Sequence, residues 1–85
     1  MNEKIKTQLH EYLDLKLRLC KQYMQEHDLA AAKAVWQQAI GAVEYTSVSA
    51  YSLYPNAGLS AEIDIIWEIN YKKAFEKTLF PEMGE

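Results

Sequence analysis

Residues 60–80 read SAEIDIIWEINYKKAFEKTLF, and they decide whether the chain is all-α or mixes helix with strand. Apolar residues alternate with polar ones over most of 63–71, which is the spacing of a half-buried strand. The order of charges indicates a helix instead, because acids gather at the front and lysines at the back, with Glu68 four residues before Lys72. No turn residue interrupts the segment before Pro81, so we expect one helix over about 60–80.

Residues 3–27 predict a long amphipathic helix at the start of the chain. They contain no Gly or Pro and are rich in Lys, Glu, Gln and Leu, which favour helix. At about 100° per residue their apolar side chains cover nearly half of the circumference. One neighbouring helix would not cover so wide an arc, so we expect part of it, with Leu15 and Leu19, to face a second chain.

The middle of the chain predicts a second helix over about 28–53. Asp28 is placed to cap it, and the short connection would fold it back on the first helix as an αα-hairpin. The β-branched and aromatic residues of 43–54 leave a runner-up open, an α+β fold with a hairpin between 43–54 and 62–71. The preferred fold is all-α: a single helical domain over 1–85, as a three-helix bundle or an αα-hairpin plus a C-terminal helix.

The uncharged segment, residues 45–61, is the most unusual stretch of a chain that is 25% charged. A solvent-facing stretch of this length normally carries charges, so we expect it to be buried against the domain, a second chain or a partner. Tyrosine and serine are typical of recognition surfaces, which makes Tyr45, Tyr51 and Tyr54 candidate contacts. Alternatively, small residues such as Ser47 let two helices approach closely while the tyrosines fill the edges. A turn is expected at residues 55–58, Pro-Asn-Ala-Gly.

The candidates for chemistry are few, and each has a simple structural interpretation. His10 and Asp14 have the i, i+4 spacing of a metal-ligand pair, but they lie on the polar side of the helix, so we expect a solvated pair and no metal. Cys20 lies in the apolar arc and is expected to be an inert thiol. Glu44, bordering the uncharged segment, is the one acid that suggests a binding role. We therefore expect no enzyme and no cofactor.

The composition narrows the classes of function further. A chain of 85 residues with one cysteine has a small core and no internal disulfide, which favours a homo-oligomer, most simply a dimer, or a protein partner. A single arginine makes nucleic-acid binding unlikely. No apolar leader or membrane-length run is present, so we expect a cytoplasmic protein.

These observations lead to two hypotheses of function. The first is a non-catalytic helical interaction or structural protein that self-associates. The alternative is a small-ligand-binding module whose aromatic pocket is walled by Trp36, Tyr51, Tyr54 and Trp67, with Glu44 at its border.

Overall fold

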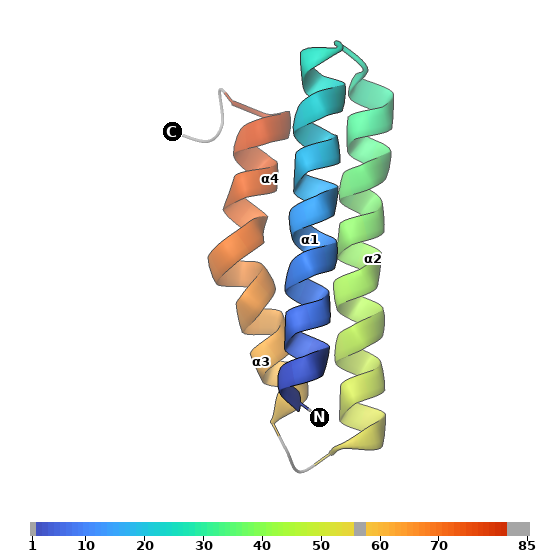
Figure 1. Ribbon diagram of the computed structural model, residues 1–85, viewed down its shortest axis with the longest axis vertical. Helices are drawn as coiled ribbons and strands as arrows, with labels where there is room; N and C mark the ends of the chain where they lie inside the picture. The colour runs from blue at the N-terminus through green and yellow to red at the C-terminus, as the bar shows by residue number, and fades with distance from the viewer. Residues whose placement is uncertain (1, 56–57, 82–85) are drawn as a thin grey trace.

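The computed structural model describes residues 2–55 and 58–81, and these form a three-helix bundle (Figure 1). Each helix packs on the other two. The third helix is continuous but has three parts: an α-helical start, a π-helical turn and an α-helical end. The elements are α1 (Asn2–Gln25), α2 (Leu29–Leu53), α3 (Leu59–Ile66), η1 (Trp67–Tyr71) and α4 (Lys72–Leu79). The all-α prediction is confirmed, and the described residues contain no strand, so the hairpin between 43–54 and 62–71 is not formed.

The connection between α1 and α2 is the tight reversal that the sequence predicts. His27 adopts a left-handed conformation with φ of 60°, which turns the chain at the end of α1. Asp28 then caps α2, because its Oδ1 accepts a hydrogen bond of 3.1 Å from the backbone N–H of Ala31. The two helices therefore run antiparallel as an αα-hairpin.

The connection between α2 and α3 begins at Tyr54 and ends at Gly58. Gly58 has φ of 69°, a conformation that glycine adopts at no steric cost. Asn56 and Ala57, the middle of the predicted turn, lie outside the described residues. Just beyond the turn, the Ser47 and Ser60 hydroxyls hydrogen-bond at 2.7 Å and join α2 to α3.

The core is filled by one face of each helix, and α1 contributes to two interfaces. The largest fully buried side chains are Phe75, Leu13, Leu59, Ile63 and Cys20. The wide apolar arc of α1 is covered on one side by α2 and on the other by the third helix, so its width does not by itself require a second chain. Leu19 packs against this core, whereas Leu15 remains 46% exposed.

The π turn η1 corrects the spacing of core residues along the third helix. Buried residues follow one another at three or four positions in α3 and again in α4, but a step of five separates Ile66 from Tyr71. In a regular α-helix this step would rotate Tyr71 away from the core. The backbone widens instead, and the N–H of Lys72 donates to the Trp67 carbonyl five residues earlier.

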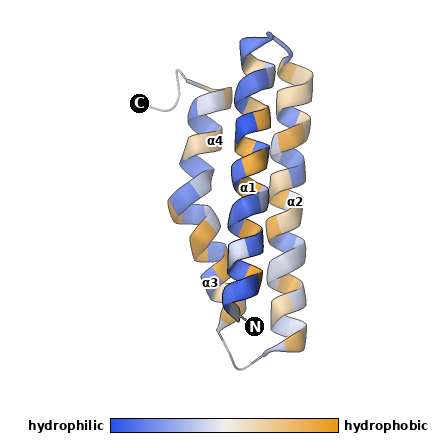
Figure 2. Ribbon diagram, viewed as in Figure 1, coloured by the Kyte–Doolittle hydropathy of each residue, from blue (hydrophilic) through white to orange (hydrophobic). Residues whose placement is uncertain are grey.

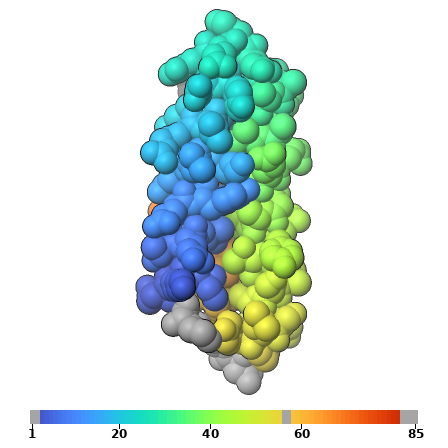
Figure 3. Space-filling view, turned by 45° about the vertical axis from the view of Figure 1, so that its right-hand side comes forward, coloured from blue at the N-terminus to red at the C-terminus, as the bar shows by residue number. Residues whose placement is uncertain are grey.

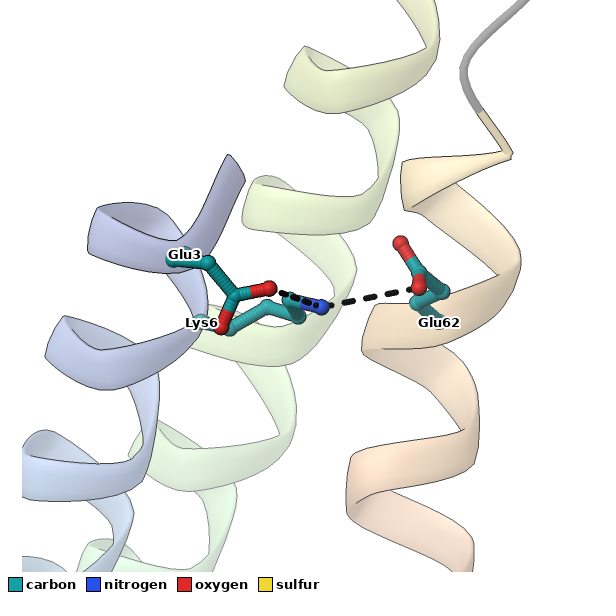
Figure 4. Close-up of polar contacts among 3 residues, drawn as sticks. All are labelled: Glu3, Lys6 and Glu62. Atoms are coloured by element: carbon teal, nitrogen blue, oxygen red, sulfur yellow. Dashed lines mark hydrogen bonds and ion pairs between the residues drawn. The ribbon is translucent and has the colours of Figure 1, made fainter. Parts of the chain in front are cut away.

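Lys6 makes a polar link between α1 and α3 near the N-terminus (Figure 4). Its Nζ lies 2.9 Å from Glu3 Oε1 and 3.5 Å from Glu62 Oε1. The hydrogen bond with Glu3 raises the pKa of Lys6, with a smaller contribution from Glu62. Both acids are well exposed, so the link orients the helices more than it stabilises them.

Deletion of one residue tests the role of η1. Removing Asn70, which is exposed within the π turn, should convert the turn to α-helix and leave Tyr71, Phe75 and Leu79 facing the core. We expect the variant to keep its helical circular dichroism and to unfold cooperatively, with a free energy of unfolding within about 1 kcal/mol of wild type.

The matched control is deletion of Glu11, an exposed residue in the regular helix α1. No π turn absorbs that change, so Leu9 and the residues before it rotate about 100° out of register, at a cost of at least about 3 kcal/mol. Equal losses of stability in the two deletions would contradict the interpretation of η1 as one extra residue that the helix can lose without changing its core register.

Candidate interaction surface

The uncharged segment divides into a buried side and an exposed side of α2. Ser47 and Ala50 face the core. Tyr45, Val48 and Tyr51 point away from it and are 77%, 67% and 65% exposed. The predicted burial against the domain is therefore correct for the small residues of α2 and for Leu59. The outward tyrosines do not fill the edges of a helix contact in this chain.

The exposed residues form a continuous strip that we call the α2 outer face. Its members follow the three- and four-residue spacing of one helix side, opposite the buried side. Figure 3 brings α2 forward beside α1, and in Figure 2 the lower part of α2 is mostly orange and pale, in contrast to the deep blue bands of α1. The α2 outer face consists of Ala30, Ala34, Gln37, Gly41, Glu44, Tyr45, Val48, Tyr51 and Ser52.

The other predicted surface residues lie apart from this strip or only border it. Tyr54 is partly buried against the core at the end of α2. Leu15 lies on α1, where its neighbours one helical turn away include the exposed charges Glu11 and Arg18. Single exposed apolar residues are common on protein surfaces, so Leu15 carries a weaker signal than the α2 outer face.

The aromatic residues predicted to wall one pocket make their contacts at different places in the bundle. The Trp36 ring lies edge-on to Phe80, with centroids 5.8 Å apart, and Trp67 lies 5.6 Å from Phe75. Tyr51 and Tyr54 do meet, at an open depression of about 330 Å³ beside the α2–α3 turn, where Ser60 and Asp64 also contribute. Glu44 is exposed on the α2 outer face and is absent from that lining.

A polar cluster joins α1 to the π turn, and the sequence analysis missed its centre. Tyr71 is only 4% exposed, yet its hydroxyl lies 2.7 Å from Asp14 Oδ1, 3.0 Å from His10 Nδ1 and 3.2 Å from the His10 carbonyl. The single hydroxyl proton goes to the carboxylate, the shortest and charged contact, and His10 Nδ1–H then donates to the hydroxyl oxygen. The predicted His10–Asp14 pair is thus bridged by a third residue.

Burial places Tyr71 in a fixed protonation state over the ordinary pH range. Burial raises the pKa of the phenol above its usual value, and the hydrogen bond to Asp14 raises it further. Asp14 also lines a shallow depression of about 400 Å³ on α1, together with Glu11, Leu17, Arg18 and Lys21. The buried phenol therefore joins the helices, while Asp14 reaches the surface.

Residues 2–55 and 58–81 hold no group of three or more His, Cys, Asp or Glu side chains able to bind a metal ion. Within the same ranges, no helix has the length and apolar content to cross a membrane.

Replacement of Tyr71 by Phe tests the polar cluster. The ring remains in the core while the hydroxyl bonds are lost, so we expect a loss of about 1 kcal/mol at neutral pH. Because the pKa of Tyr71 is raised in the folded state, its contribution is complete below the ordinary value of about 10 and is lost as the pH rises above it.

Chemical denaturation from pH 7 to 11.5 measures this difference between wild type and Tyr71→Phe. The two stabilities should converge at the alkaline end. A constant gap across the range would show that the phenol does not ionise on unfolding as argued.

Comparison with known proteins identifies no relative of this chain. No family model matches the sequence, and no match was found among curated proteins or solved structures.

Proposed function

We propose that this chain is a non-catalytic helical interaction protein that self-associates through the α2 outer face. The observation that carries the proposal is the exposure of Tyr45, Val48 and Tyr51 along one side of α2. Apolar side chains at such spacing form an interface when a second helix packs on them. An aromatic-rich strip with little charge has the composition of an interface centre.

The small core of the bundle supports self-association. Chains of this length bury a modest share of their surface on folding and gain stability from burial in an oligomer. Covering the α2 outer face removes large apolar side chains from water at about 25 cal/mol per Å². This gain is available without any rearrangement of the three helices.

A non-catalytic role agrees with the state of the reactive side chains. Burial raises the pKa of the Cys20 thiol, which disfavours the nucleophilic thiolate. The Tyr71 hydroxyl is enclosed by its hydrogen bonds and has little contact with solvent. A free thiol also suits the reducing cytoplasm, which we propose as the compartment.

The alternative function is binding of a small ligand at the depression beside the α2–α3 turn. Its volume of about 330 Å³ lies at the lower end of the range for ligand pockets, and Tyr51 and Tyr54 supply aromatic walls. Self-association is favoured because the depression is open and its largest exposed wall, Tyr51, also belongs to the α2 outer face.

The test compares two exposed aliphatic positions, Val48 and Leu15, by sedimentation at micromolar concentration. Val48→Glu places a charge in the α2 outer face and should weaken self-association at least about tenfold. Leu15→Glu is the matched control on α1 and should leave the assembly unchanged. Both positions are exposed, so both variants should retain the helical circular dichroism of wild type.

The outcomes separate the competing interpretations. If Leu15→Glu dissociates the assembly and Val48→Glu does not, the interface lies on α1 and not on the α2 outer face. A wild-type chain that stays monomeric to about 100 μM, where even weak specific pairs associate, would contradict self-association and favour the ligand site.

A further inference from the structure

The bundle has opposite charges at its two ends. We call residues 3–13, 41–55 and 58–70 the lower half and residues 14–40 and 71–81 the upper half, as oriented in Figure 1. The lower half has two basic and six acidic residues, a net charge of −4. The upper half has seven basic and four acidic residues, a net charge of +3, a count that leaves out Glu82 and Glu85 because they lie outside the described residues. The contacts Tyr71–Asp14 and Lys16–Gln38 place the dividing levels of the three helices beside one another.

The direction of the helices explains this polarity. α1 and the third helix both run from the lower to the upper end. The third helix has its acids early and its bases late, the order that complements a helix dipole, whereas α1 carries two acids and two bases over residues 3–13 and gains further bases only after Asp14. α2 runs the opposite way but is nearly free of charge in its lower part. The charge difference between the two halves therefore comes mainly from the third helix, and the bases in the second half of α1 add to it.

Side-chain size also differs between the two ends of the α2 outer face. Its upper part carries Ala30, Ala34 and Gln37, and its lower part carries Tyr45 and Val48. Between them lies Gly41, an exposed glycine in the middle of a 25-residue helix. A Cβ on Gly41 would meet nothing within 4 Å, so no contact inside the chain requires glycine, which costs a helix roughly 0.5–1 kcal/mol relative to alanine.

From these three features we infer that the partner on the α2 outer face is a second copy of this chain, antiparallel to the first, with the two α2 helices crossing at Gly41. This inference rests on the proposed self-association and specifies its geometry. On α2 itself, the antiparallel pair brings Glu44 of one copy toward Lys33 of the other, and it sets the acidic half of each copy at the level of the basic half of the other. The same reversal sets Val48 against Ala34, a large residue against a small one, and sets the two small residues Ser52 and Ala30 against each other.

Glycine at the crossing point allows the two helix backbones to approach closely. Gly41→Leu is compatible with the isolated chain, because the space around the position is open. In the antiparallel pair the two leucines collide at the axis of symmetry. We expect unchanged or higher helix content and a dissociation constant raised at least about tenfold. Unaltered self-association of Gly41→Leu would overturn the crossing point.

Crosslinking determines the direction of the pair. Ala30→Cys and Ser52→Cys change exposed positions at opposite ends of α2. Mixed together with a short bismaleimide, the two variants should give a heterodimer crosslink between positions 30 and 52. Ser52→Cys alone should give little crosslink to itself. Wild type, whose Cys20 is buried, is the background control.

The charge argument has its own test in Glu44 and Lys33, which lie on the same flank of α2. In the antiparallel pair, Glu44 of one copy lies about 8 Å along the axis from Lys33 of the other, within reach of both side chains. Glu44→Lys should weaken the dimer several-fold at low salt, and the exchange K33E/E44K should restore it. Failure of the exchange to restore association would overturn charge pairing across this face.

These experiments separate the inference from the function on which it rests. A dimer in which Ser52→Cys crosslinks to itself, or in which positions 30 and 52 do not crosslink, would overturn the antiparallel geometry and leave self-association intact. A wild-type monomer in sedimentation would overturn both.

Discussion

The apolar arc of α1 is the constraint on which the rest of the structure depends. Nearly half of the circumference of this helix is apolar, and no single helix can cover that much surface. The chain meets the requirement with two neighbours, α2 folded back by the Asp28 cap and the third helix returning along the other side. Leu13 and Cys20 are fully buried as a result.

The return of the third helix requires a local change in helix geometry. Its core residues are spaced correctly within α3 and within α4, but the two sets are out of register by one residue. The π turn absorbs that residue and so allows Phe75 and Leu79 to enter the same core as Leu59 and Ile63. It also places Tyr71 beside α1, where a buried hydroxyl needs a hydrogen-bond partner and finds Asp14.

The same packing leaves one side of α2 largely exposed. The core takes the small residues of the uncharged segment, because Ser47 and Ala50 allow the helices to approach closely. The large residues Tyr45, Val48 and Tyr51 are consequently turned to solvent. The bundle thus presents its apolar strip on a helix that is already held on its other side, a rigid arrangement that suits recognition of a second molecule.

The sequence alone determined the helical elements of this protein. Charge order, the Asp28 cap and the absence of turn residues within the segments are local signals, and they predict the three helices to within a few residues of their ends. They also show that the stretch after Tyr45 is unusual, because the lack of charge is visible without any fold.

Only the tertiary structure decided which side of each helix is covered. The arc of α1 that suggested a second chain, with Leu19 in it, is covered largely from within the chain. Trp36 and Trp67, which were expected to wall one pocket, pack instead against different partners, Phe80 and Phe75. The contact of Tyr71 with Asp14 spans 57 residues, so no local pattern contains it. Periodicity tells which residues share a helix face, but burial depends on the angles at which three helices meet, and those follow from packing of side chains distant in sequence.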